Sequence, residues 1–379
     1  MTNRRTRRPT TGSAAVTGLA AGIALLALGS AQAAEEKVLN VYNWSDYVAE
    51  DTVPNFEQQS GIKVNYDVYD TQDVLESKLL AGRSGYDVVG PTLAPYAARQ
   101  LKSGIYQKLD KSKIPNFGNL DSKLMARVAK YDPGNEYLVP YMWGTTGIGY
   151  NVKMVKERLG ENAPLDSWRL IFDPEVVSKL ADCGVSVMDS PDETFPAMLN
   201  YLGLDPDGHK VEDVDKVAEA YMKIRPHIRK FHNSQYINDL ANGEVCVAMG
   251  YSGDILQARD RAQEADNGNE IVYVIPTEGA QLWFDMLAIP ADAPHPENAH
   301  TFINYILEPK VTAAISDYVA YANANAKATP LVSEDVRNDP GIYPSEETMN
   351  RLWVVTPHDL KYERARTRAW TRIRSGSEG

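Results

Sequence analysis

Residues 38–47 read Val-Leu-Asn-Val-Tyr-Asn-Trp-Ser-Asp-Tyr, and they decide how the start of the chain folds. Apolar and polar residues alternate over Val38–Tyr42, the pattern of a β-strand with one buried face. A helix is expected over Val48–Gln59, closed by Gly61, because glycine commonly ends helices in a left-handed conformation. The segment Tyr42–Tyr47 is therefore expected in a loop between a strand and a helix.

That loop is a candidate site for a cation. In open α/β sheets, ligands bind outside the carboxyl ends of the strands. Trp44 and Tyr47 offer aromatic faces to a positive charge. Ser45 and Asp46 lie between those rings, and the carboxylate can pair with a cation. The alternative is structural: Ser45 or Asp46 caps the helix while Trp44 packs on the core.

Strands and helices continue to alternate after this loop. Ile62–Tyr69 alternates cleanly and predicts a second strand. A helix is expected between Thr71, as its cap, and Gly82. Tyr86–Val89 predicts a third strand. This order of elements predicts an α/β fold with mainly parallel sheets flanked by helices.

A second lobe is expected further along the chain. Tyr141–Tyr150 is rich in glycine and is not expected to form one regular element, so we interpret it as the first crossing between lobes. Ile271–Pro276 predicts a strand that returns the chain to the first lobe. Lobes joined by such crossings can close on a ligand. The expected division gives residues 34–140 and 277–320 to the first lobe, and 141–276 and 321–379 to the second.

Further helices are predicted in both lobes. The clearest apolar stripe of helical period runs over Val211–Ile224. The others are Gln235–Gly243, Asp254–Ala265, Pro296–Leu307 and Pro309–Val319. The tail Tyr362–Ile373 is rich in arginine and aromatic residues, and we interpret it as an exposed surface helix, with a basic docking patch as the alternative.

The first 33 residues have the pattern of an export signal. Arginines within Arg4–Arg8 precede an apolar stretch, Ala14–Leu28, and Ala31–Ala33 supplies a small-residue cleavage site. We expect a signal peptide at residues 1–33 and a mature protein in the periplasm. Four of the 39 basic residues leave with it, so 35 basic residues remain against 51 acidic ones, a net charge of −16. This balance disfavours nucleic acid as a partner and favours cations.

The only cysteines are Cys183 and Cys246. Two cysteines in an exported chain are expected to form one disulfide. Each lies next to or within an apolar run typical of a strand, and neighbouring strands would bring them within bridging range. Closing a loop of about 60 residues stabilises a fold by roughly 4 kcal/mol on the chain-entropy account.

Three later stretches repeat the combination of aromatics and acids. Tyr251 and Asp254 follow a predicted strand, where helix capping is the alternative role of Asp254. Trp283 and Asp285 lie inside an apolar strand, and Tyr321 follows a helix. An ionised carboxylate is costly to bury alone, so Asp285 either has a fixed internal partner or faces a binding site. Tyr251 and Tyr321, each taken alone, favour core positions.

Signatures of catalysis or metal binding are weak. The six histidines form no pair spaced four residues apart and no His-x-x-Glu group, so no metal site is expected. Gly250-x-Ser252-Gly253 lacks the spacing of a nucleophile elbow. Gly144-x-x-Gly147-x-Gly149 is neither a Walker loop nor a dinucleotide fingerprint. We expect no enzyme activity and no cofactor, with a periplasmic hydrolase as the remote alternative.

Several longer stretches make the chain recognisable. They are Tyr42–Tyr47, Pro140–Trp143, Thr145–Asn151, Ser234–Gly243, Tyr321–Asn325 and Arg368–Trp370. On these residues, and over essentially the whole mature length, the sequence resembles the periplasmic polyamine-binding proteins of ABC importers, in particular the putrescine-binding branch. The resemblance implies a two-lobed periplasmic binding protein fold, type II-like, that closes on an extended polyamine.

The resemblance also implies roles for single residues. The aromatic box along the methylene chain corresponds to Trp44, Tyr47, Tyr251, Trp283 and Tyr321. Polar contacts near one end correspond to Ser45, Asp46 and Thr92. Asp254 and Asp285 match the carboxylate pair at one ammonium group, and Glu193 matches the acid toward the other end. The two cysteines match a disulfide of the family.

Departures from the family pattern bear on the choice of polyamine. Tyr251 stands where putrescine binders usually have Trp, and Trp283 stands where they usually have Phe, as in the spermidine-preferring branch. Ser190 and Val355 replace the Asp and Gln that spermidine binders often use, which favours putrescine. The loop Thr92–Tyr96 is one residue longer than usual.

We therefore expect a monomeric periplasmic receptor that captures polyamines, putrescine ahead of spermidine, and delivers them to the permease of an ABC importer. The alternatives are a spermidine-preferring receptor and a sensor that presents polyamine to a membrane receptor.

Overall fold

The computed structural model describes residues 35–376. The signal peptide expected at residues 1–33 lies outside the described residues. Within them, no helix is both long and apolar enough to span a membrane.

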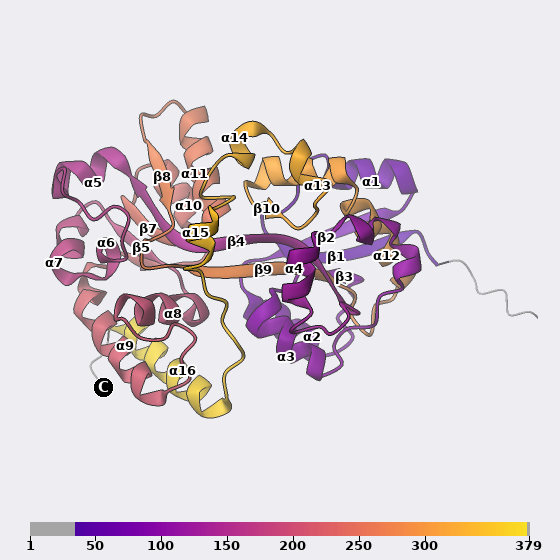
Figure 1. The fold of residues 1–379 in the computed structure, drawn as a ribbon, viewed down its shortest axis with the longest axis horizontal. Helices are drawn as coiled ribbons and strands as arrows, with labels where there is room; N and C mark the ends of the chain where they lie inside the picture. The colour runs from indigo at the N-terminus through magenta and orange to yellow at the C-terminus, as the bar shows by residue number, and fades with distance from the viewer. Residues whose placement is uncertain (1–34, 377–379) are drawn as a thin grey trace, which may run out of the picture. The chain divides into compact units, whose positions relative to one another are not determined.

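A sheet runs through the middle of the described residues (Figure 1). Its strands are β1 (Val38–Trp44), β2 (Lys63–Tyr69), β3 (Val88–Val89), β4 (Leu138–Asn151), β5 (Val185–Val187), β6 (Lys230–Phe231), β7 (Val247–Tyr251), β8 (Ile271–Val274), β9 (Gln281–Ala288) and β10 (Ala322–Asn323). They follow the order β2-β1-β3-β9-β4-β7-β5-β6, and β8 and β10 also pair with β4.

The two ends of the sheet are parallel and its centre is antiparallel. β1 pairs in parallel with β2 and β3, and β5 pairs in parallel with β6 and β7. β4 and β9 lie between these ends and pair antiparallel with each other. The predicted α/β class is confirmed, but the sheet is mixed, because the two long central strands run against each other.

The expectation that Tyr141–Tyr150 forms no single regular element is wrong. These residues belong to β4, which is buried along its whole length. Its glycines allow neighbours to pack closely. A Cβ atom on Gly144 would lie 2.7 Å from the indole ring of Trp283, and one on Gly149 would lie 2.6 Å from a methyl carbon of Ile255. The glycines thus mark close packing and do not break the strand.

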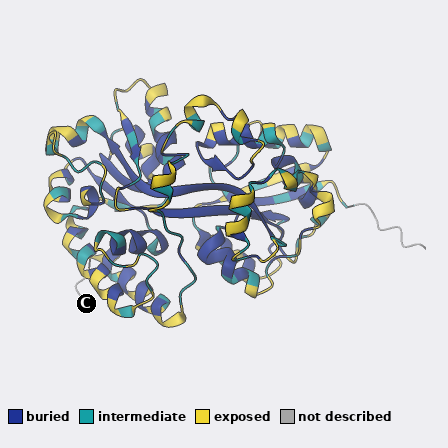
Figure 2. Cartoon of the chain, viewed as in Figure 1, coloured by how far each residue is buried: buried dark blue, intermediate teal, exposed yellow. Residues whose placement is uncertain are grey.

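Helices cover both faces of the sheet, and Figure 2 shows exposed residues on their outer sides and buried residues along the strands. Their bounds are α1 (Thr52–Ser60), α2 (Gln72–Leu80), α3 (Ala98–Lys102), α4 (Ser122–Val128), α5 (Val152–Leu159), α6 (Arg169–Phe172), α7 (Pro174–Val177), α8 (Pro191–Tyr201), α9 (Val211–Ile224), α10 (Tyr236–Ala241), α11 (Ser252–Glu264), α12 (Pro296–Ile306), α13 (Pro309–Val319), α14 (Glu334–Arg337), α15 (Glu346–Met349) and α16 (Leu360–Ser375). The predicted strands and helices are present, with ends that differ by a few residues.

The last helix is less exposed than expected. In α16 one face carries the buried residues Tyr362, Arg366, Trp370 and Ile373, spaced as successive helical turns. The indole nitrogen of Trp370 donates to Asp189 at 3.1 Å. The tail is therefore a packed amphipathic helix, and only its other face carries the exposed arginines.

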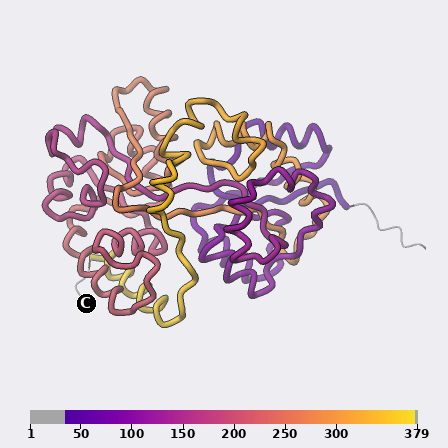
Figure 3. Tube along the Cα trace, in the orientation of Figure 1, coloured from indigo at the N-terminus to yellow at the C-terminus, as the bar shows by residue number. Residues whose placement is uncertain are grey.

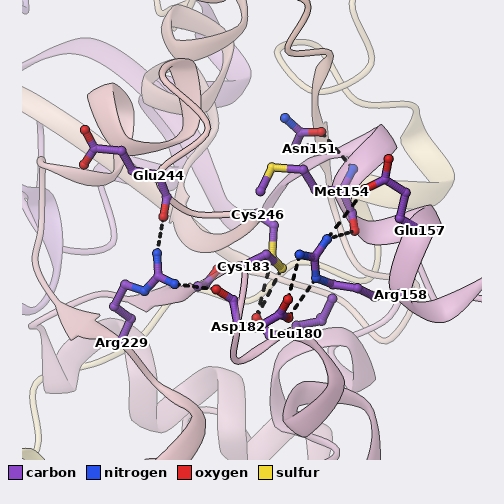
Figure 4. Close-up of a disulfide and its surroundings, with 11 residues drawn as sticks. Asn151, Met154, Glu157, Arg158, Leu180, Asp182, Cys183, Arg229, Glu244 and Cys246 are labelled. Carbon is purple, nitrogen blue, oxygen red and sulfur yellow. Dashed lines mark hydrogen bonds and ion pairs between the residues drawn. A yellow bond between two sulfur atoms is a disulfide. The ribbon is translucent and has the colours of Figure 1, made fainter.

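The predicted disulfide between Cys183 and Cys246 is present (Figure 4). Cys183 lies just before β5 and Cys246 just before β7, and these strands are parallel neighbours. Their Cα atoms are 5.5 Å apart, within the usual range for a disulfide. Both cysteines are buried in the core around Trp168 and Tyr221.

Candidate functional site

Five aromatic side chains from distant parts of the sequence form one wall. They are Trp44 at the end of β1, Tyr47 in the loop after it, Tyr251 at the end of β7, Trp283 in β9 and Tyr321 after α13. Ring centroids are 5.6 Å apart for Tyr47 and Tyr321, 5.2 Å for Trp283 and Tyr321, 5.5 Å for Tyr251 and Trp283, and 6.4 Å for Trp44 and Tyr251. These are edge-to-face contacts, which hold the rings in fixed orientations.

Asp285 lies in the middle of this wall. Its carboxylate accepts hydrogen bonds from the hydroxyls of Tyr47 at 2.7 Å and Thr92 at 2.6 Å. Burial raises the pKa of Asp285 to about 6, although these hydrogen bonds favour the charged form. Within residues 35–376 it forms no ion pair with lysine or arginine. Asp285 therefore has fixed internal partners, which are the hydroxyls of Tyr47 and Thr92 and not a basic residue, and it also lines the cavity described below.

Asp254 holds a similar position in the first turn of α11. Its carboxylate accepts hydrogen bonds from Tyr321 at 2.7 Å and Tyr236 at 2.8 Å. Burial raises the pKa of Asp254 to about 6. The residue that precedes α11 is Tyr251, and its side chain makes no capping bond. Asp254 is thus not the helix N-cap, and its side chain faces the aromatic wall.

The cap role considered for Ser45 and Asp46 is also wrong. α1 begins only at Thr52, after Asp51. The Ser45 hydroxyl donates to Asp70 at 2.9 Å, and the Asp46 carboxylate lies 3.7 Å from Arg261 of α11. Both side chains therefore remain at the carboxyl end of β1, away from the start of the helix.

A third acid, Glu193, lies in α8. It is 7 % exposed and accepts hydrogen bonds from Thr146 at 2.7 Å and Gln281 at 3.1 Å. Burial raises the pKa of Glu193 to about 8, and the charges of Asp192 and Asp285 add to the shift. Glu193 also forms no ion pair with lysine or arginine in the described part of the chain, so no protein cation neutralises it.

Eleven of the twelve residues predicted to contact a ligand line one cavity. They are Trp44, Ser45, Asp46, Tyr47, Thr92, Glu193, Tyr251, Asp254, Trp283, Asp285 and Tyr321. The twelfth, Ser190, lines an adjoining pocket, which shares Trp44, Thr92 and Glu193 with the cavity.

The cavity also contains residues that the sequence analysis did not single out. They are Tyr69, Asp70, Asn233, Ser234 and Ile237. Asp70 follows the end of β2, the neighbour of β1, so its position at a strand end was a usable signal. Ser234 and Ile237 lie within a stretch that carried the family resemblance. For Asn233 no local signal was available.

In the adjoining pocket, one acid, Asp192, is already paired with other residues of the protein. The Tyr96 hydroxyl donates to Asp192 at 2.6 Å, and Arg366 of α16 pairs with the same carboxylate at 2.6 Å. Burial alone would raise the pKa of Asp192, but Arg366 and the Tyr96 hydrogen bond hold it below its usual value. Asp192 is therefore a neutralised structural acid, unlike its neighbour Glu193.

This arrangement can bind a cation that brings its own positive charge. Carboxylates and aromatic faces attract ammonium groups, and burial excludes the water that would weaken the attraction. The cavity places Asp254, Asp285 and Glu193 around an aromatic wall.

Comparisons with known proteins agree on a family. The model of the family described as "Bacterial extracellular solute-binding protein" matches residues 51–344. The chain is 56 % identical over 348 residues to the putrescine-binding periplasmic protein SpuD of Pseudomonas aeruginosa, covering 92 % of this chain and 95 % of that one. It is 54 % identical over 362 residues to the putrescine-binding periplasmic protein PotF of Escherichia coli, covering 95 % and 98 %.

A solved structure has the same fold. The spermidine/putrescine ABC transporter substrate-binding protein PotD of Streptococcus pneumoniae superposes with a TM-score of 0.73 at 26 % identity, over 90 % of this chain and 99 % of that one. The likeness therefore extends over nearly all of the described residues.

Proposed function

The chain belongs to the family of bacterial extracellular solute-binding proteins, and we propose that it is the periplasmic receptor of an ABC importer that captures putrescine. The relatives named for putrescine binding are more than half identical to it over almost their whole length. In this proposal the protein binds and releases its ligand unchanged.

One observation carries the proposal: three acids line an aromatic cavity, and within residues 35–376 none of them forms an ion pair with lysine or arginine. Asp254, Asp285 and Glu193 all have raised pKa values because burial disfavours their charged forms. A ligand with ammonium groups would restore the missing positive charge. Each ammonium beside a carboxylate gains on the order of 4 kcal/mol of Coulomb energy at an effective dielectric near 20, much of it offset by desolvation.

The acids are arranged for a ligand with two charged ends. Asp285 and Asp254 each bind a tyrosine hydroxyl, and those tyrosines, Tyr47 and Tyr321, are in ring contact. We assign this pair to one ammonium group, with Ser45, Asp46 and Thr92 as nearby polar contacts. Glu193 belongs to α8 and is assigned to the other end. The aromatic wall would then line the methylene chain between them.

Putrescine is proposed ahead of spermidine. Both highly similar relatives are named for putrescine alone. Ser190 lines the adjoining pocket and offers a hydroxyl in place of a carboxylate, so an additional amine would find one acid fewer there, and Asp192 of the same pocket is already paired with Arg366. Trp283 favours spermidine, so a spermidine-preferring receptor is the second candidate.

Delivery requires a periplasmic protein with lobes that move. We propose export through residues 1–33, a monomer in the periplasm, and lobes made of residues 34–140 with 277–320 and of residues 141–276 with 321–379. Closure of these lobes would present one surface to the membrane permease.

A hydrolase is not favoured, because Ser252 is buried in the strand-to-helix junction and its oxygen accepts from the Thr145 amide.

The ligand carried by the natively purified protein tests this proposal. Denaturing the protein should release putrescine in a ratio approaching one per chain, measured by chromatography of the supernatant. An Asp285→Asn variant prepared in parallel should release much less. Release of a different class of solute, such as an amino acid or a sugar, would contradict the proposal.

A further inference from the structure

Three metal-ligand side chains meet at a place separate from the polyamine cavity. They are Asp207 and His209, in the loop between α8 and α9, and His358, just before α16. One ligand atom from each lies within 4.8 Å of the others. None of the three lines the cavity or its adjoining pocket. Their wide separation in sequence explains why histidine spacing did not reveal the group.

The side chain of His358 is buried, and within residues 35–376 its ring nitrogens have no partner at hydrogen-bond distance and geometry. Its side chain is 3 % exposed, and no described residue forms a hydrogen bond with either ring nitrogen, although the backbone of Gly208 lies close. The carboxylate of Glu363 lies 3.6 Å from Nδ1 and is already paired with Arg366. A buried imidazole normally has at least one partner, because an unpaired buried polar group costs free energy. The missing partner points to a ligand.

The other two residues of the group lie beside His358 and share a contact with Thr356, whose hydroxyl is 3.0 Å from Nε2 of His209. His209 is 42 % exposed, so the site is open to solvent, and its ring lies 4.3 Å from that of His358. Asp207 accepts hydrogen bonds from the backbone amide of Thr356 at 2.7 Å and from its hydroxyl at 3.0 Å. These bonds fix the carboxylate while leaving lone pairs free, which is the support that metal-bound carboxylates usually have.

The donor set selects a class of metal. Two imidazoles and one carboxylate suit Zn²⁺ and similar transition metals, whereas Ca²⁺ and Mg²⁺ prefer oxygen ligands only. With bonds of about 2.0–2.1 Å, ligand atoms of a tetrahedral ion stand about 3.3–3.5 Å apart. The His209 nitrogen already lies 3.9 Å from the Asp207 carboxylate. To bind the ion, Nε2 of His209 would exchange its contact with the Thr356 hydroxyl for the metal, which a rotation of the exposed ring allows.

We propose that Asp207, His209 and His358 form a binding site for a divalent transition-metal ion of the Zn²⁺ class, with water as the fourth ligand. The nearby positive charge of Arg366 is partly neutralised, because Asp192 and Glu363 both pair with it. The ion would tie the loop before α9 to the segment that enters α16. Figure 3 shows this segment, in yellow, passing between the two groups of helices before it reaches α16.

Zinc titration of the tag-free mature protein tests the site. A chromophoric zinc chelator serves as competitor, and no free thiol interferes because both cysteines are in the disulfide. We expect one Zn²⁺ per chain, with affinity at least tenfold lower in His209→Gln and Asp207→Asn. His227→Gln changes a histidine outside the group and should bind zinc as the wild type does. Zn²⁺, but not Mg²⁺, should raise the thermal midpoint of the wild type and of His227→Gln, and raise it less in His209→Gln and Asp207→Asn.

The variants remain informative only if they fold. His209→Gln alters an exposed side chain, so its circular dichroism and its putrescine affinity should match those of the wild type. Given a folded variant, zinc affinity equal to that of the wild type would overturn the proposal. Failure of the wild type to bind Zn²⁺ would also overturn it, and would mean that the two histidines only stack on each other and on Tyr362. Neither result would affect the proposed polyamine site.

Discussion

The hydroxyl of Tyr96 donates a 2.6 Å hydrogen bond to the carboxylate of Asp192. Tyr96 lies before α3, beside β3 and β9, whereas Asp192 lies in α8, which packs with α9 and α16. The same carboxylate is fixed by Arg366 of α16. This contact joins two parts of the molecule next to the proposed polyamine cavity, and Tyr96 ends the loop Thr92–Tyr96, which we predict to be one residue longer than is usual in the family.

Removing the Tyr96 hydroxyl should weaken ligand retention. Tyr96→Phe keeps the ring and its stacking under Arg99 but loses the bond to Asp192. Hydrogen bonds to charged groups contribute about 1.5–3 kcal/mol, so we expect putrescine to dissociate roughly tenfold faster, measured by stopped-flow fluorescence. Tyr86→Phe is the matched control, because its hydroxyl donates to the exposed Asp67. Equal dissociation rates in Tyr96→Phe and the wild type would contradict this role.

Asp285→Asn should weaken putrescine binding at least roughly tenfold, a loss of about 1.4 kcal/mol, without unfolding the protein. The amide keeps the shape of the side chain but loses the charge that pairs with an ammonium group. Asp260→Asn is the control, because Asp260 is exposed and lies outside the cavity. Calorimetry gives the affinity and circular dichroism checks the fold. An affinity like that of the wild type would remove Asp285 from the site.

Binding should release a proton near neutral pH. The pKa of Glu193 is raised to about 8 in the ligand-free protein, so this acid is mostly protonated at pH 7. A bound ammonium favours the charged form and lowers that pKa, so binding expels the proton. Affinity should therefore rise with pH by nearly tenfold per unit between about pH 6 and 8, then level off. Titrations at pH 7 in buffers of different ionisation enthalpy measure the released proton.

Glu193→Gln should abolish this proton release and flatten the pH dependence above pH 6. The same pKa shift acts on stability with the opposite slope. A carboxyl group whose folded pKa lies above its unfolded value of 4.5 stabilises the fold at low pH, and that stability is lost as pH rises toward about 8. The ligand-free protein should thus melt at lower temperature at pH 8 than at pH 5, and the difference should shrink in Glu193→Gln. Unchanged proton release in the variant would assign the proton to another group.

Replacing both Cys183 and Cys246 by serine should lower the free energy of unfolding by roughly 4 kcal/mol on the chain-entropy account, given the 63-residue separation. The folded variant should bind putrescine with unchanged affinity, because neither cysteine lines the cavity. Urea denaturation followed by fluorescence measures the first effect and calorimetry the second. Equal stability of the variant and the wild type would contradict the prediction.

Local patterns predicted most of the fold. The alternation at Ile62–Tyr69 and the helical stripe at Val211–Ile224 correspond to β2 and α9. They failed for β4, where glycine composition suggested a break, because close packing against Trp283 and Ile255 depends on distant residues. Local patterns also failed to predict the buried face of α16. The arginine-rich composition suggested an exposed helix, but Arg366 is buried because it pairs with Asp192.

The candidate site was predictable where acids and aromatics break an apolar pattern, as Asp285 does in β9. The hydrogen-bond partners of these residues were harder to predict from the sequence. Tyr236, which donates to Asp254, and Thr146, which donates to Glu193, belong to other elements and carry no local mark of their role. The spacing of histidines in the sequence could not reveal the group that contains His209 and His358, because only tertiary contacts bring its members together.

The most direct test is a calorimetric titration of the unfolded and refolded, ligand-free mature protein with putrescine, cadaverine, agmatine, spermidine and spermine. Refolding removes any polyamine that the protein carries from its host. The account predicts binding of one putrescine per chain, tighter than that of spermidine. The reverse order would make Trp283 the residue that selects the ligand, and binding of none of these polyamines would contradict the central claim.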